Sequence, residues 1–253
     1  MSNSINEKTF GLIANPNNKK IVSELEKAGA KIVKFPPFEA EKIEPDANSV
    51  EHLSNLVEFD WIIFPDVLTV DFFLQSLEEN AVDFFELDEI RVCAFGEVIS
   101  DRLRFARLHA DVIPNTIKTD DVLSALKNYI AAEDLKELEF LLPKEISLRN
   151  EIKNELLKAG GKVSELPIYE IKFSKDSEIS KLKALVKGGA IDEFIFSAPT
   201  DFIALNYIFS GESLAQIFAD IEISAVDEII YQTIRENNLK CAGLFQPGKV
   251  AKV

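Results

Sequence analysis

The stretch K-A-G-A-K-I at residues 27–32 returns as K-A-G-G-K-V at residues 158–163. Farther along the chain, I-R-V-C-A-F-G-E-V-I at residues 90–99 returns as I-E-I-S-A-V-D-E-I-I at residues 221–230. A period of about half the chain indicates two copies of one unit, not a solenoid of short repeats. Small ligands usually bind in clefts at domain interfaces. The repeat therefore predicts two similar domains with a cleft between them.

Each copy alternates short apolar runs with helical patterns. Residues 10–14 and 31–35 are apolar runs typical of buried strands. Between them Ile21, Val22 and Leu25 recur at helical spacing. Strand–helix–strand order is the building block of parallel sheets. We therefore predict an α/β fold made of two similar parallel-sheet α/β domains.

Two extended segments interrupt this alternation at equivalent positions of the repeat. Pro36 and Pro37 open the first segment, and Pro167 lies at the start of the second. Proline disfavours continuation of a helix and pushes the residue before it towards extended backbone. We expect residues 37–47 and 166–173 to be inter-domain linkers, so that the chain passes between the domains twice.

Composition and charge exclude several classes of function. The 253 residues are 47% hydrophobic and 28% charged, as in globular proteins, and the net charge is −15. Nucleic acids and anionic membrane surfaces both attract basic patches, so neither is expected as a partner. The first eight residues are polar and no apolar run approaches the ~20 residues that span a bilayer. We therefore expect a cytoplasmic protein.

The chain is poor in residues that bind metals or act as nucleophiles. Cys93 and Cys241 lie in apolar contexts and are interpreted as small buried hydrophobic residues. His52 and His109 are far apart and show no ligand spacing. This pattern argues against a histidine-based metal site or catalytic triad.

Several blocks, in this order and spacing, resemble the uroporphyrinogen-III synthase family. They are E-F-D-W-I-I-F at residues 58–64, C-A-F-G-E-V-I-S-D-R-L at 93–103, L-L-K-A-G-G-K-V-S-E-L-P-I-Y-E at 156–170 and F-I-F-S-A-P-T-D-F at 194–202. The resemblance covers nearly the whole chain. It rests on the order of the blocks, because no single motif is diagnostic.

The resemblance implies a discontinuous domain organisation and a reaction. Residues 1–36 with 174–253 would form one domain, and residues 48–165 the other. The family cyclises the linear tetrapyrrole hydroxymethylbilane to uroporphyrinogen III, with loss of water and inversion of the last pyrrole ring. It does so without a cofactor or metal, largely by positioning its substrate. We therefore expect a monomer whose partner is this small molecule.

The resemblance also suggests Tyr169 as the catalytic residue. It lies in the second predicted linker, where the family has a tyrosine in its cleft, and its phenol could hydrogen-bond the departing hydroxyl. The alternative is a packed aromatic ring, because Phe38 fills the equivalent position of the first copy.

The resemblance implies five further residues for substrate binding, at turns where strands open into helices and where helix N-termini attract carboxylates. They are Gly96, Ser100, Ser197, Thr200 and Tyr231. The alternatives are a plain helix cap at Ser197 or Thr200 and an ordinary glycine turn at Gly96. In the other copies of these turns, Asp227 replaces Gly96, and Pro65-Asp66 replaces the serine turn. We expect Asp66 to repel carboxylates.

Two other functions remain open at this stage. A non-catalytic relative could keep the two-domain fold and bind a ligand or protein, since both helix-start turns depart from the family pattern. A two-domain solute-binding protein is the third class, although such proteins are usually exported.

Overall fold

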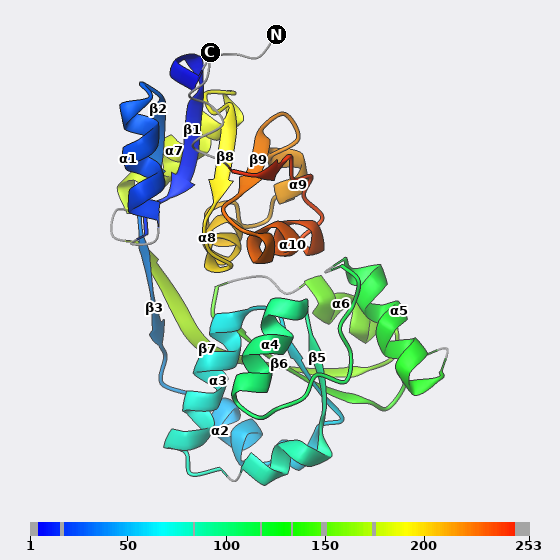
Figure 1. Ribbon diagram of the computed structural model, residues 1–253. Helices are drawn as coiled ribbons and strands as arrows, with labels where there is room; N and C mark the ends of the chain where they lie inside the picture. Colours follow the sequence, from blue (N-terminus) through cyan, green and yellow to red (C-terminus); the bar gives the residue numbers. More distant parts are fainter. Residues whose placement is uncertain are drawn as a thin grey trace. The chain divides into compact units, whose positions relative to one another are not determined.

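A computed structural model describes residues 5–15, 18–82, 84–116, 118–132, 134–147, 151–173 and 176–245. The chain divides into two compact units (Figure 1). Unit 1 comprises Met1–Glu39 and Lys172–Val253, and unit 2 is Ala40–Ile171. The predicted domain boundary at residue 174 lies outside the described residues.

Unit 1 contains a five-stranded sheet with the order β10-β9-β8-β1-β2, and its neighbouring strands are parallel. The strands are β1 (Thr9–Ile13), β2 (Lys31–Phe35), β8 (Glu193–Phe196), β9 (Glu222–Ala225) and β10 (Gly243–Leu244). Strand order reverses between β1 and β8, because β2 lies on one side of β1 and the later strands on the other. In open parallel sheets, ligands bind at the carboxyl ends of the strands at such a reversal.

Unit 2 contains the sheet β3-β7-β6-β4-β5. Its strands are β3 (Phe38–Lys42), β4 (Trp61–Phe64), β5 (Arg91–Ala94), β6 (Glu139–Glu145) and β7 (Lys162–Phe173). β4 is parallel to β5 and β6, and β6 is parallel to β7. Here the order reverses between β6 and β4. Two sheets of similar order, dominated by parallel pairs, confirm the predicted α/β fold class.

Helices alternate with the strands in both units (Figure 1). Unit 1 has α1 (Lys19–Lys27), α7 (Asp176–Lys187), α8 (Thr200–Ile208), α9 (Leu214–Ile217) and α10 (Glu228–Glu236). Unit 2 has α2 (Ala47–Ser54), α3 (Val67–Glu79), α4 (Glu97–Phe105), α5 (Thr119–Ile130) and α6 (Glu151–Lys158). The described residues also form the 3₁₀ helices η1 (Ile5–Glu7), η3 (Leu56–Glu58) and η4 (Phe84–Glu89). None of the helices in the described part of the chain has the length and apolarity to cross a bilayer.

The segment that follows Lys162 is one continuous strand. We predicted a strand that ends near residue 166 and a separate linker after it, but β7 runs on to Phe173 and lies beside β3. Pro167 has no N–H to donate, yet the ladder continues because its register shifts at Lys144 and Glu145. Glu145 then pairs with Tyr169 and leaves Ile168 out of the β6 register. Such a bulge lets a strand tolerate a proline.

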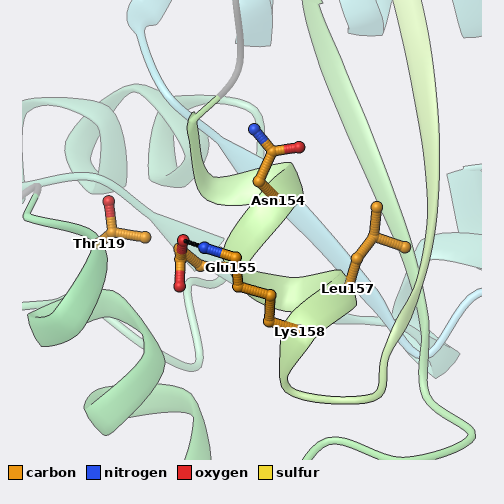
Figure 2. Close-up of a pocket in the computed structure, with 5 residues that line it drawn as sticks. All are labelled: Thr119, Asn154, Glu155, Leu157 and Lys158. Atoms are coloured by element: carbon orange, nitrogen blue, oxygen red, sulfur yellow. Dashed lines mark hydrogen bonds and ion pairs between the residues drawn. The ribbon is translucent and has the colours of Figure 1, made fainter.

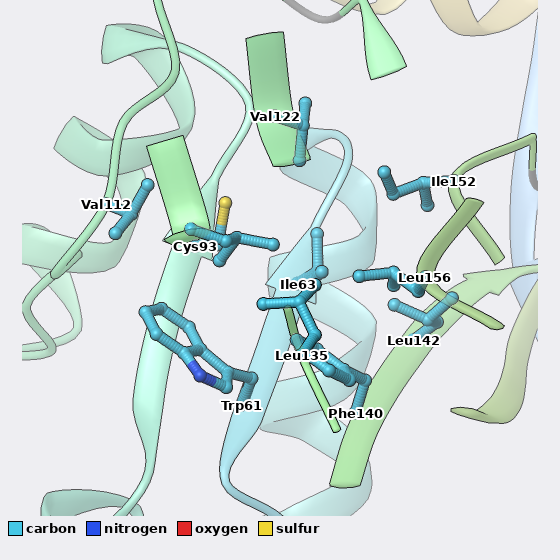
Figure 3. Close-up of a cluster of buried hydrophobic side chains, with 11 residues drawn as sticks. Trp61, Ile63, Cys93, Val112, Val122, Leu135, Phe140, Leu142, Ile152 and Leu156 are labelled. Atoms are coloured by element: carbon cyan, nitrogen blue, oxygen red, sulfur yellow. The ribbon is translucent and has the colours of Figure 1, made fainter. Parts of the chain in front are cut away.

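One face of the unit 2 sheet is covered by α5 and α6. Alternate residues of β4 and β6 point to this face, as the two-residue period of a strand requires. Figure 3 shows the resulting cluster of buried side chains. Its members are Trp61, Ile63, Cys93, Val112, Val122, Leu126, Leu135, Phe140, Leu142, Ile152 and Leu156. Each large side chain contributes roughly 1.5–3 kcal/mol by leaving water, so this core fixes the strand ends that carry the candidate site.

Candidate functional site

In unit 1 a polar cluster closes the reversal between β1 and β8. Asn15 follows β1, and its Nδ2 donates a hydrogen bond to Ser197 Oγ at 2.8 Å. Asn18 Nδ2 lies 3.4 Å from the same oxygen. Ser197 directly follows β8 and is buried. The candidate Ser197 is therefore tied to the neighbouring strand end by amide donors.

The carboxylate of Asp201 fills the turn after β8. Its Oδ2 accepts hydrogen bonds from Ser197 N at 2.7 Å, Ala198 N at 3.0 Å and Ser197 Oγ at 3.2 Å. Burial raises the pKa of Asp201 to about 6, although the hydrogen bonds from Ser197 and Ala198 oppose the rise. The N–H groups that we predicted for a substrate carboxylate are thus occupied by the chain's own carboxylate.

Thr200 is the first residue of α8, and the N-cap position belongs to Pro199, which makes no side-chain cap. The alternative interpretation of Ser197 or Thr200 as a plain N-cap is therefore wrong. The reason is local: Asp201 folds back onto the turn and satisfies its N–H groups from inside the first helical turn.

The turn after β9 is closed in a different way. Asp227 is the N-cap of α10, and its Oδ1 accepts a hydrogen bond from Ile230 N at 2.8 Å. Tyr231 follows in the same helical turn and is half-buried. A carboxylate that caps a helix also suits the positive end of the helix dipole, so this turn too is supplied with its own anion.

The turn after β5 has no such cap. Gly96 occupies the N-cap position of α4 with φ 114° and ψ 166°, and it makes no side-chain hydrogen bond there. This backbone region is essentially restricted to glycine. Ser100 is buried one turn later, and its Oγ accepts a hydrogen bond from Arg104 Nη2 at 3.4 Å. Gly96 and Ser100 therefore lie together, at the one predicted turn of the four where no side chain caps or fills the helix start.

In unit 2, Tyr169 on β7 meets Asp66, which follows β4. The Tyr169 hydroxyl donates a hydrogen bond to Asp66 Oδ2 at 3.1 Å. Asp66 is also the N-cap of α3, where Oδ1 accepts from Thr69 N at 2.7 Å and Oδ2 from Thr69 Oγ1 at 2.8 Å. The ring of Tyr169 stacks on Phe72 with centroids 5.1 Å apart. Tyr169 is fully buried, whereas Asp66 is half-buried.

This environment perturbs both groups of the pair. Burial raises the pKa of Asp66, while hydrogen bonds from Thr69, Tyr169 and the Leu68 N–H act in the opposite direction. Burial, followed by the negative charge of Asp66, raises the pKa of Tyr169, and Glu145 adds to the rise. A half-buried carboxyl with a raised pKa beside a phenol is the kind of group that can exchange a proton.

Sequence reasoning missed the roles of Asp66 and Asp201. The D-x-x-T spacing of Asp66 and Thr69 is a capping signal that could have placed the start of α3, but nothing in the sequence showed that its second oxygen faces Tyr169. Asp201 carried no signal at all, since acids are common in the first turn of a helix.

We next searched the described residues for other places that could hold a ligand or a metal. Among the described residues, no group of three or more His, Cys, Asp or Glu side chains is arranged to hold a metal ion. Figure 2 shows a hollow of about 550 Å³ on unit 2. It is lined by Thr119, Asn154, Glu155, Leu157 and Lys158, none of which is a predicted site residue. Lys158 Nζ and Glu155 Oε1 form an ion pair at 2.5 Å across its wall.

Comparisons with known proteins agree with the fold. A solved uroporphyrinogen III synthase from Thermus thermophilus is 18% identical, covers 96% of each chain and superposes with a TM-score of 0.64. A native crystal form of the wild-type enzyme from the same organism is 17% identical, covers 96% of this chain and 94% of its own, and gives a TM-score of 0.63. The comparison with curated proteins gave no match.

At this low identity the solved structures show a shared fold alone. The family model is more specific, because it matches a sequence pattern and not only a shape. The model described as uroporphyrinogen-III synthase HemD matches residues 19–243, which include every predicted site residue. The chain therefore belongs to the uroporphyrinogen-III synthase family.

Proposed function

We propose that this protein is a uroporphyrinogen-III synthase, which cyclises hydroxymethylbilane with loss of water and inversion of the last ring. The observation that carries the proposal is the family match over residues 19–243. The proposal includes a monomeric enzyme that needs no cofactor. It also keeps the expected domains, residues 1–36 with 174–253 and residues 48–165.

Substrate binding is assigned to the turns at the carboxyl ends of the strands. The start of α4 at Gly96 and Ser100 is the most favourable place for a substrate carboxylate, since its cap position holds no acid. At Ser197 and Thr200 a carboxylate would first have to displace Asp201. Tyr231 would offer its hydroxyl from the first turn of α10. Tyr169 is the candidate for assisting departure of the hydroxyl, and its own hydroxyl donates to Asp66.

The test is product analysis with freshly generated hydroxymethylbilane. Without an enzyme this substrate closes to isomer I, so the proposal requires isomer III as the main product after chromatographic separation. Formation of isomer I alone would reject the proposed activity. Tyr169→Phe should lower the rate of isomer III formation. Tyr129→Phe is the matched control, because Tyr129 also donates to an aspartate, Asp111, at 2.9 Å, but is half-exposed.

A second candidate is a non-catalytic member of the family that binds a tetrapyrrole or a protein. The observation in its favour is that Asp201 and Asp227 already occupy two of the turns expected to hold substrate carboxylates. Thermal-shift titration with a uroporphyrin, combined with the isomer assay, distinguishes an active synthase from a non-catalytic binding protein. Stabilisation by the porphyrin without formation of isomer III would favour the binding protein.

A further inference from the structure

Asp66 has two oxygens with different tasks. Oδ1 caps α3 by accepting from Thr69 N at 2.7 Å, which is all that a helix cap requires. Oδ2 accepts from Thr69 Oγ1 and from the Tyr169 hydroxyl, which comes from β7 about a hundred residues later. The second oxygen is therefore held by two hydroxyl donors in a fixed orientation, beyond the needs of the cap.

The two members of the pair differ in access. Tyr169 is fully buried, with its ring stacked on Phe72, whereas Asp66 is half-buried at the end of β4. A group that reacts with a ligand must be reached by it, and Asp66 is the residue of this pair that keeps exposed surface. The Tyr169 hydroxyl donates to the carboxyl of Asp66 at 3.1 Å.

Resting on the proposed function, the geometry points to Asp66 as the catalytic acid that protonates the departing hydroxyl, with Tyr169 as the positioning residue that holds Asp66. The C–O bond of the hydroxymethyl group breaks, its electron pair leaves with oxygen, and the Asp66 proton completes a water molecule. The remaining methylene and its pyrrole form an azafulvenium cation beside the new carboxylate. The attacked pyrrole later releases one proton, so none is consumed overall.

The electrostatic surroundings suit this role. A carboxyl acid must hold a proton near neutral pH, and burial raises the pKa of Asp66. The groups that act on the pair come from three elements: Thr69 and the Leu68 N–H on α3, Tyr169 on β7, and Glu145 on β6, whose charge acts on Tyr169. Donation by Thr69 and Tyr169 stabilises the carboxylate that forms when the proton leaves.

The test compares Asp66→Asn with Tyr169→Phe in the isomer assay, with kcat measured against pH. Asparagine keeps the cap of α3 but carries no ionisable proton. We expect kcat to fall about 100-fold or more in Asp66→Asn, with KM little changed and the decline at high pH abolished. Tyr169→Phe should lose only about fivefold, the worth of one hydrogen bond. Because it removes a donor to the carboxylate, it should also move the decline in activity to higher pH.

Controls separate this role from a structural one. Asp111→Asn removes a carboxylate that also accepts from a tyrosine, Tyr129, and should leave kcat and its pH profile unchanged. Thr69→Ala removes the other hydroxyl donor and should shift the decline upward as Tyr169→Phe does. If Asp66→Asn fails to fold, the pH profile of Thr69→Ala still tests the role of Asp66. A larger loss in Tyr169→Phe than in Asp66→Asn, or an unshifted profile in Thr69→Ala, would overturn the assignment. A wild-type protein that forms only isomer I would instead reject the proposed function, and the assignment with it.

Discussion

The two units reverse their strand order at equivalent places but close these places with different chemistry. In unit 1, between β1 and β8, the carboxylate of Asp201 turns back onto the N–H groups of its own turn. In unit 2, between β6 and β4, the carboxylate of Asp66 reaches a side chain on another strand, Tyr169. Both reversals are bridged by side chains that are distant in sequence, but the bridge in unit 1 is the amide of Asn15 on Ser197, whereas in unit 2 the carboxylate of Asp66 makes the bridge itself.

This difference shows what the duplication kept. Both copies retain parallel strands that end in a turn and a helix, because the apolar faces that pack the strands are repeated. The polar residues after the strands differ between the copies, because a buried polar group needs a hydrogen-bond partner but different side chains can supply one. The two copies of one fold can therefore differ in function. Substitutions placed in one copy or the other test this difference.

The largest loss of stability is expected for Tyr169→Ala, which removes the contact between Tyr169 and Asp66 in unit 2. It removes a fully buried ring and its stack on Phe72, and such truncations cost roughly 3–5 kcal/mol. Trp61 is the one tryptophan of the chain and lies in the unit 2 core, so its fluorescence during urea unfolding reports on this unit. Tyr169→Phe keeps the ring and should lose about 1 kcal/mol. Equal losses in the two variants would contradict the packing role.

The second prediction concerns the pH dependence of unit 1. The pKa of Asp201 rises from 3.8 to about 6 on folding. Between these values the folded state binds more protons than the unfolded state, so the contribution of Asp201 to stability falls as pH rises from about 4 to 6. The loss is on the order of 2–3 kcal/mol, at about 1.4 kcal/mol per pKa unit.

Asp201→Asn isolates this contribution, because asparagine accepts the same hydrogen bonds without titrating. Hydrogen exchange of the β8 and α8 amides, measured from pH 4 to 7, should show the wild type losing protection relative to Asp201→Asn. The Trp61 transition in unit 2 serves as the internal reference. A difference that stays constant across this range would mean that Asp201 does not titrate there.

The sequence predicted those features of the two units that depend on the periodicity of apolar residues. The repeat and the alternation of apolar runs predicted two sheets dominated by parallel strands, with helices between the strands. The start of α5 shows where such patterns stop, because its N-cap position is Lys118, which makes no side-chain cap hydrogen bond. η4 and the four-residue α9 were missed, since such short elements show no period.

The candidate site was less predictable, for a physical reason. Gly96 could be found from the sequence because it matches the family's glycine between a strand and a helix, and its φ of 114° in the structure suits a glycine. The partners of Asp66 and Asp201 depend on tertiary contacts and on one bulge at Lys144 and Glu145, which sets the register of Tyr169. A bulge of this kind follows from Pro167 only once its neighbouring strand is known.

A third prediction tests the open turn at Gly96. Its φ of 114° with ψ 166° is nearly closed to other residues, so Gly96→Ala should lose about 2 kcal/mol through backbone strain. Gly189→Ala provides the comparison, since Gly189 has a φ of 69° and open space around its Cα. Its strain is milder, about 1 kcal/mol. Urea unfolding followed by circular dichroism measures the free energy of unfolding of both variants. If Gly96→Ala loses no more stability than Gly189→Ala, then the backbone at Gly96 does not require glycine.

The smallest effect is expected at Asp227, the counterpart of Gly96 in unit 1. Asp227→Ala removes the acceptor for Ile230 N at the start of α10 and should cost about 1 kcal/mol, as for other capping residues. Asp227→Asn keeps an oxygen acceptor and should cost only a few tenths. Circular dichroism in urea resolves the difference. If both variants lose the same amount, the charge of Asp227 acts through the helix dipole and its hydrogen bond adds little. If neither loses stability, then α10 is fixed by the packing of Ile230 and Ile234 alone, and the two copies of this turn differ in sequence without differing in stability.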